Sequence, residues 1–279
     1  MRDRGGVERE GFDVWAAGSS YDRYMGRWSR LVAEEFVAWL GCGDGLRWLD
    51  VGCGTGVLSA VLAARCRPRT VTGVDRSEAF VRSATTSTWG FVVGDAMALP
   101  LRAGSCDVAV SALTLNFLGD PAAAVTGMAA AVRPGGTVAA YVWDYAHGMG
   151  FLRRFWDAAV RADPSAAELD EGRRFPECRP DALRAQWAGA GLTDVSTVAI
   201  DVPVVFADFD DLWEPFLAGQ GPAPAYVASL RPIDRDRLRD VLSTAVERGE
   251  DGSTGFTCRA WAVRGHKPDH LDADRATPL

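Results

Sequence analysis

The sequence of 279 residues is poor in lysine and histidine, and it lacks paired cysteines. Lys267 is the single lysine against 29 arginines, and the three histidines, His147, His266 and His270, do not group with the six cysteines in any zinc-binding spacing. No CxxC pair occurs. We therefore expect no metal site and reduced cysteines, as in a cytoplasmic protein.

Long apolar runs are also missing. The most apolar region, 108–132, is interrupted by Gly119-Asp120-Pro121, which leaves two stretches too short to cross a membrane. The first six residues lack the apolar segment of a secretory signal. We expect a cytoplasmic protein with no membrane partner, present as a monomer or a homodimer.

The chain has no block of basic side chains. Its net charge is −7, and the acidic excess lies in residues 151–279, whereas residues 41–150 are neutral. Because binding to a phosphate backbone needs clustered positive charge, nucleic acid is not an expected partner.

Short apolar segments alternate with helical ones from residue 46 onward. The expected strands are 46–51, 70–74, 91–93, 106–111, 137–142, 195–205 and 255–263. The expected helices are 31–40, 57–64, 78–84, 122–132, 150–162, 181–190, 210–217, 223–230 and 234–247. This alternation predicts an α/β fold with a doubly wound, Rossmann-like and mostly parallel sheet.

The pattern predicts one domain, 1–265, and a flexible tail, 266–279. Within the domain we expect an N-terminal helical cover at 1–44, a ligand-binding core at 45–145, helical cap insertions at 146–178 and 207–250, and segments 179–206 and 251–265 that complete the sheet. Arg133-Pro134-Gly135-Gly136 is expected to form a turn before a strand.

A glycine-rich turn follows the first expected strand. Residues 48–56 read Trp-Leu-Asp-Val-Gly-Cys-Gly-Thr-Gly and lead into a helix whose free N–H groups point at the turn. A dinucleotide site needs a third glycine where this chain has Val57. Asp75, at the end of the next strand, can accept hydrogen bonds from ribose hydroxyls. The turn therefore favours an adenosine ligand without a pyrophosphate, although the glycines also fit a turn without a ligand and Asp75 also fits a helix cap.

Five segments occur together in a recognisable order. They are LDVGCGTG at 49–56, VTGVDRS at 71–77, VVGDAMALPL at 92–101, CDVAVSALTLNF at 106–117 and RPGG at 133–136. Over about residues 45–145 the chain resembles the class I S-adenosylmethionine-dependent methyltransferases, in particular the small-molecule group of the ubiquinone and menaquinone biosynthesis type. The resemblance implies a seven-stranded sheet with an antiparallel last strand, and S-adenosylmethionine as cofactor.

The resemblance also implies roles for individual residues. Asp50 would orient the ammonium group of the cofactor, Asp75 would hold its ribose, and Asp95 with the backbone N–H of Ala96 would read its adenine. Arg27, in an N-terminal segment that folds over the cofactor, would pair with the carboxylate. The full implied set is Tyr21, Arg27, Asp50, Gly52, Cys53, Gly54, Gly56, Asp75, Arg76, Asp95, Ala96, Ser111 and Ala112. Asp95 also fits a turn, and Arg27 also fits a solvated helix face.

Methyl transfer is an in-line displacement, so positioning can supply much of the rate. His147 is the candidate general base, although a loop histidine is often only solvated. The expected acceptor walls are Asn116, Phe117, Met149, Phe155 and Trp213, which favour a flat or lipophilic acceptor but also fit a core.

The predicted function is methyl transfer from S-adenosylmethionine to an O, N or C atom of a small aromatic or lipophilic metabolite. The segment after 106–111 lacks the Asp/Asn-Pro-Pro-aromatic pattern of enzymes that methylate base amino groups. The alternatives are a binding or regulatory protein, or a non-methylating enzyme, on the same fold. A nucleotide-dependent oxidoreductase is a third reading, disfavoured by the glycine spacing.

Overall fold

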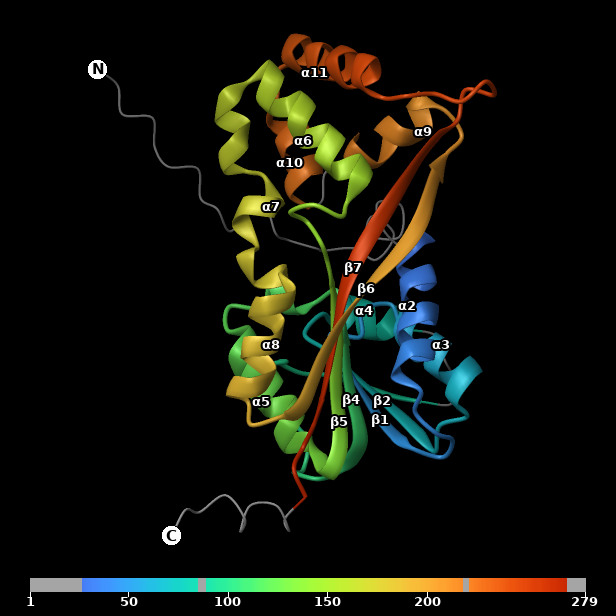
Figure 1. Cartoon of the computed structure of the whole chain (residues 1–279), viewed down its shortest axis with the longest axis vertical. Helices are drawn as coiled ribbons and strands as arrows, with labels where there is room; N and C mark the ends of the chain where they lie inside the picture. The colour runs from blue at the N-terminus through green and yellow to red at the C-terminus, as the bar shows by residue number, and fades with distance from the viewer. Residues whose placement is uncertain (1–26, 85–88, 218–220, 270–279) are drawn as a thin grey trace, which may run out of the picture.

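The computed structural model describes residues 27–84, 89–217 and 221–269. Figure 1 shows a twisted sheet with helices on both faces and a further group of helices beyond one end of it. Tyr21 lies outside the described residues, and the side chain of Arg27 is not described. Within the described part of the chain, no helix has the length and apolarity needed to span a bilayer.

One seven-stranded sheet organises the molecule. Its strands are β1 (Arg47–Val51), β2 (Thr70–Asp75), β3 (Gly90–Val93), β4 (Cys106–Ala112), β5 (Val132–Trp143), β6 (Thr193–Phe206) and β7 (Thr254–His266). The order is β3-β2-β1-β4-β5-β7-β6. Only β7 runs antiparallel to its neighbours, β5 and β6. The prediction of a doubly wound sheet with an antiparallel last strand is therefore confirmed.

Helices cover both faces of this sheet. α2 (Arg27–Leu40) and α3 (Val57–Cys66) lie on one face, and α5 (Pro121–Ala131) and α8 (Pro180–Gly189) lie on the other (Figure 1). α4 (Glu78–Ser83) connects β2 to β3. Because both faces are covered, the central strands are almost wholly buried, which agrees with the apolar residues at their centres, such as residues 108–110 of β4.

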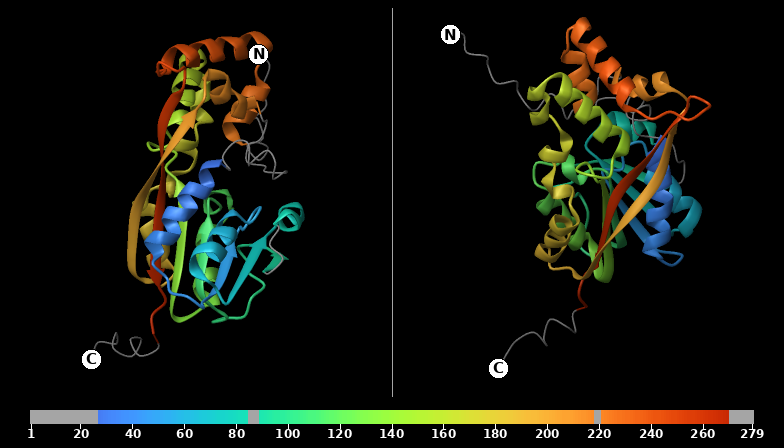
Figure 2. Two further views of the ribbon diagram at one scale, coloured as in Figure 1. Left: turned by 90° about the vertical axis from the view of Figure 1, so that its right-hand side faces the viewer. Right: turned by 45° about the horizontal axis from the view of Figure 1, so that its top comes forward.

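Apart from η3 (Leu115–Phe117), which follows β4, the remaining described helices form a cap beyond the carboxyl end of β5. They are η4 (Pro164–Glu168), α6 (Gly150–Ala162), α7 (Glu171–Arg174), η5 (Pro176–Cys178), α9 (Phe209–Trp213), η6 (Glu214–Leu217), α10 (Pro222–Ser229) and α11 (Pro232–Ala245). Figure 2 shows β6 and β7 extending past the other strands to reach this cap. Within the expected insertion 146–178, the residues after α6 form η4, α7 and η5, each too short to give a helical sequence period.

Two strand boundaries differ from the prediction by three residues or more. β5 begins at Val132 rather than at 137, since Val132 already pairs with Cys106 across a register shift and the Arg133–Gly136 segment stays in the strand. β7 continues to His266, which pairs with both Thr137 and Thr193, so the expected tail starts too early.

Asp107 ties three strands together at the end of the sheet opposite the cap. Its carboxylate accepts from the Arg47 guanidinium at 3.0 Å and from the Arg133 Nε at 2.7 Å, and the Arg47 backbone N–H donates to it at 2.8 Å. The Arg47 hydrogen bonds hold the pKa of the Asp107 carboxyl well below its usual range.

Asp107→Asn is expected to lower the free energy of unfolding by roughly 1–2 kcal/mol at pH 7, because it removes charge-assisted hydrogen bonds from a carboxylate that is largely buried. Since a depressed pKa stabilises the fold above the unfolded pKa, the difference between variant and wild type should shrink as the pH falls below about 4. Urea unfolding at pH 7 and pH 3.5 tests this. Asp181→Asn, at an ion pair whose carboxylate side chain is 89% exposed, is the control and should change little. An Asp107→Asn loss no larger than that of the control would contradict the assignment.

Candidate functional site

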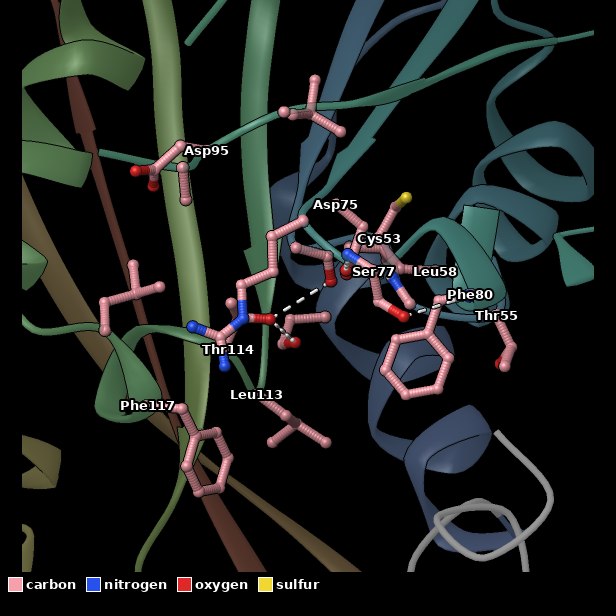
Figure 3. Close-up of a pocket in the computed structure, with 18 of the residues that line it drawn as sticks. Cys53, Thr55, Leu58, Asp75, Ser77, Phe80, Asp95, Leu113, Thr114 and Phe117 are labelled. Carbon is pink, nitrogen blue, oxygen red and sulfur yellow. Dashed lines mark hydrogen bonds between the residues drawn. The ribbon is translucent and has the colours of Figure 1, made fainter. Parts of the chain in front are cut away.

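A cavity of about 320 Å³ opens at the carboxyl ends of β1, β2, β3 and β4 (Figure 3). This is where the strand order reverses between β1 and β4, the position at which open α/β sheets bind their ligands. Eight of the predicted cofactor residues line it, namely Gly52, Cys53, Gly54, Asp75, Arg76, Asp95, Ala96 and Ala112.

The β1–α3 turn forms the floor of the cavity. Gly52 and Gly54 have φ values of +71° and +52°, which residues with a side chain rarely adopt. The N–H groups of Gly52 and Cys53 both donate to the Val74 carbonyl, at 2.7 and 3.1 Å. A Cβ on Gly52 would lie only 2.3 Å from the side chain of Thr114. The turn is therefore held from both sides, and its bare backbone faces the cavity.

Asp75 braces this turn from the end of β2. One carboxylate oxygen accepts from the Gly54 N–H at 3.0 Å, and the other accepts from the Ser77 N–H at 2.8 Å. The cap of α4 is Ser77, whose hydroxyl accepts from Phe80. Each Asp75 oxygen keeps a second lone pair, so the carboxylate can fix the loop and still accept from two ligand hydroxyls.

Asp95 follows β3 on the opposite side of the cavity. Its Oδ1 accepts from the Met97 N–H at 2.9 Å, the local turn that the sequence left open as an alternative. Asp95 is nevertheless exposed and lines the cavity beside the buried Ala96. The turn thus holds Asp95 in place with acceptor capacity left for a ligand.

Asp50 lies beneath the glycine turn and does not line the cavity. Its side chain is fully buried, Oδ2 accepts from the Ser59 hydroxyl at 2.7 Å, and Oδ1 has no hydrogen-bond partner. Burial raises the pKa of Asp50 to about 6, and repulsion from Asp75 adds to the shift. An unpaired buried carboxylate oxygen below a cradle of bare backbone fits a ligand that carries a positive charge, as the ammonium and sulfonium of S-adenosylmethionine do.

Two other predicted cofactor residues also lie outside the cavity. The Ser111 hydroxyl is buried and donates to the Val51 carbonyl at 2.8 Å, so it joins β4 to β1. Gly56 is the N-cap of α3 with φ +85° and faces Ala84 and Phe91. Both residues shape the strand ends that carry the cavity, and neither contacts its interior.

Most predicted acceptor residues are placed elsewhere. Phe117 lines the cavity and meets Phe175 edge to face at 5.6 Å. Phe155 is fully buried and stacks on Phe216 at 4.3 Å, and Trp213 lies 6.0 Å from the same ring. Met149 and Asn116 are also buried and do not line the cavity. Met149, Phe155, Trp213 and Asn116 therefore lie in the core and not in the wall of this cavity, and helical spacing alone does not distinguish a pocket from a core.

His147 does not lie at the cavity. It is exposed, and its backbone N–H donates to the buried Asp144 at 3.1 Å, closing the turn that leads from β5 to α6. The residue predicted as general base therefore lies outside the described cavity. Among the described residues, no group of acidic, histidine and cysteine side chains is arranged to hold a metal ion.

Sequence reasoning missed several lining residues. The lining residues that the sequence did not predict include Ser29, Phe80, Met97, Leu113, Thr114 and Tyr141. Leu113 has φ +53°, an uncommon conformation for leucine, and its N–H donates to the Tyr141 carbonyl at 2.9 Å. No local sequence signal marks these positions, because a left-handed leucine and a half-buried threonine are set by the neighbouring strands.

Comparison with known proteins gives consistent results. The Methyltransferase domain family model matches residues 49–140. Demethylmenaquinone methyltransferase of Roseiflexus castenholzii is 33% identical over 166 residues, which cover 54% of this chain and 69% of that protein. 2-methyl-6-phytyl-1,4-hydroquinone methyltransferase of Synechocystis sp. is 29% identical over 180 residues, which cover 62% of this chain and only 55% of that protein.

Solved structures share the fold. The YcgJ protein from Bacillus subtilis superposes with a TM-score of 0.56 at 16% identity, over 86% of this chain and 99% of that one. At this level of identity the similarity shows a shared fold, in agreement with the strand order of the sheet.

Proposed function

Since this chain belongs to the class I S-adenosylmethionine-dependent methyltransferases, we propose that it transfers the methyl group of S-adenosylmethionine to a small aromatic or lipophilic molecule. The observation that carries the proposal is the convergence of the bare glycine turn, Asp75 and Asp95 on one cavity above the unpaired Asp50 oxygen. The two similar methyltransferases named above act, by their names, on quinone-type rings, which supports a flat acceptor.

Four of the lining residues would have defined roles in binding the cofactor. Asp75 would accept from the ribose hydroxyls and Asp95 from the adenine amino group, while Gly52 and Gly54 would leave room for the methionine part. When bound, S-adenosylmethionine supplies an electrophilic methyl group on a sulfonium. The chain would hold the acceptor in line with that methyl group and would exclude water from the cavity. Correct alignment can supply much of the rate of such a displacement.

The acceptor would approach from the β4 and β5 side. Phe117 lines the cavity there, and its ring is supported from behind by the buried Phe175, which it meets edge to face at 5.6 Å. Aromatic side chains bury flat apolar ligands well and fix them by stacking. The described lining residues include no histidine and no lysine. An acceptor that ionises readily, such as a phenol, therefore suits the site best.

Isotope-labelled S-adenosylmethionine, incubated with the full chain and a panel of phenols, hydroquinones and aliphatic acids, tests the proposal. We expect the label in a phenolic or hydroquinone product by mass spectrometry. Calorimetry should show binding of S-adenosylmethionine and S-adenosylhomocysteine but not of NAD, and Asp75→Asn should weaken the first two by about tenfold, the loss expected for a charged hydrogen-bond partner. Binding without transfer to any acceptor would favour the binding or regulatory alternative. Binding of NAD alone would refute the proposal.

A further inference from the structure

Thr114 makes the contact between the β4 loop and the glycine turn. It follows the left-handed Leu113 and is the N-cap residue of the short helix η3 (Leu115–Phe117). Its hydroxyl lies 2.9 Å from the Ala112 carbonyl and 3.2 Å from the Gly52 carbonyl, and its side chain lines the cavity (Figure 3). No sequence motif singled it out.

Thr114 fills the space beside the Gly52 Cα, where another residue would carry its Cβ. A Cβ built on Gly52 would lie 2.3 Å from both the Oγ1 and the Cγ2 of Thr114 and 2.7 Å from its Cβ. The threonine side chain therefore occupies the space next to the Gly52 Cα, while the hydroxyl reaches the carbonyl of the same residue. The single hydroxyl proton is shared between the Ala112 carbonyl and the Gly52 carbonyl, with the Gly52 arm the longer one. The Gly52 N–H is held by Val74 at 2.7 Å, so the turn is contacted on one side by β2 and on the other by Thr114.

Several contacts fix Thr114 itself. The N–H of Leu113 donates to the Tyr141 carbonyl, and the Thr114 carbonyl accepts from the Phe117 N–H at 2.9 Å. The position of the threonine is thus determined by β5 and by the turn that carries Phe117. Loss of the hydroxyl therefore removes a hydrogen bond shared by the Ala112 and Gly52 carbonyls, of which only the second belongs to the glycine turn.

We propose that Thr114 is a positioning residue that sets the direction of the Gly52 carbonyl and thereby the affinity for the amino-acid part of the bound cofactor. This inference rests on the proposed function. The Gly52 carbonyl is an acceptor at the floor of the cavity, and an ammonium group offers three donors to such an acceptor. The adenosine end would be held by Asp75 and Asp95, which Thr114 does not contact through any described hydrogen bond.

The test compares two ligands on two variants. Thr114→Val keeps the shape and removes the hydroxyl, whereas Thr114→Ser keeps the hydroxyl and removes the methyl group. Calorimetry would measure S-adenosylhomocysteine, which carries the ammonium group, and 5′-methylthioadenosine, which lacks the amino-acid part. We expect Thr114→Val to weaken S-adenosylhomocysteine by about tenfold, the effect of one hydrogen bond near a charge, and to change methylthioadenosine less than about twofold. Thr114→Ser should restore most of the affinity.

The outcomes separate the inference from simpler explanations. Equal weakening of both ligands by Thr114→Val would mean a general structural role and would overturn the inference, as would unchanged binding of both. Thermal unfolding of each variant identifies a loss caused by misfolding. If Thr114→Val misfolds, Thr114→Ala, which also lacks the hydroxyl, takes its place: a loss confined to S-adenosylhomocysteine supports the inference, and an equal loss of both ligands overturns it. Failure of the wild-type chain to bind either ligand would instead contradict the proposed function.

Discussion

Replacing Gly52 with alanine should reduce the affinity for S-adenosylhomocysteine by about 100-fold or more, which corresponds to about 3 kcal/mol. Two effects add. Alanine at φ +71° costs roughly 1 kcal/mol in backbone strain, and the new methyl group would lie 2.3 Å from Thr114, so the turn must move away from the position that faces the ligand. Calorimetry of the variant checks the affinity.

Gly191→Ala is the matched control for this variant. Gly191 has φ +75°, follows α8 on the other face of the sheet, and has open space where its Cβ would lie. It should lose roughly 1 kcal/mol of stability to the same backbone strain and keep its affinity for the ligand. If Gly52→Ala bound S-adenosylhomocysteine within threefold of the wild type, the glycine turn would not be the ligand cradle.

The second large effect concerns Asp50 and pH. Because the pKa of Asp50 is raised to about 6, the free protein carries about a tenth of this carboxyl ionised at pH 5 and about nine-tenths at pH 7. An ammonium group placed above the turn favours the ionised form, and S-adenosylhomocysteine carries such a group. The affinity for S-adenosylhomocysteine should therefore rise about tenfold from pH 5 to pH 7 and level off above, through the electric field of Asp50 rather than through direct contact.

Asp50→Asn should remove this pH dependence and weaken binding at pH 7.5 by about tenfold or more, since a buried neutral amide offers no charge to the ligand. Asp44→Asn, at an exposed carboxylate before the same strand, serves as the control and should retain the wild-type pH profile. An unchanged slope in Asp50→Asn would assign the pH dependence to another group.

The unfolding temperature of Asp50→Asn shows whether its weaker binding comes from the lost charge or from a less stable fold. A carboxyl whose pKa is raised on folding contributes less to the free energy of unfolding as the pH rises from about 4 to about 6, and its contribution then stays low. The amide that replaces this carboxyl cannot ionise, so at pH 7.5 the Asp50→Asn protein should unfold at a temperature no lower than the wild type. Weaker binding together with undiminished stability would support the assignment, whereas a lower unfolding temperature would contradict it.

By itself the sequence determined the fold class and the ligand end of the sheet. The apolar run at residues 108–110 within β4 requires cover on both faces, and the glycines at 52, 54 and 56 permit the left-handed backbone that follows β1, so both follow from local chemistry. The positions of Asp75 and Asp95 could also be predicted. Asp75 ends β2 and Asp95 follows β3, and the carboxyl ends of these parallel strands lie at the same edge of the sheet.

Only the tertiary structure decided what surrounds those residues. The buried face of α6 has the same helical spacing whether it meets a ligand or Phe216, and packing against η6 and α10 made it a core. Thr114 became part of the cavity because β5 holds Leu113 in a left-handed conformation, a contact between residues far apart in the chain. Spacing along the chain fixes the direction of a side chain, whereas its partner depends on which elements the fold brings against it.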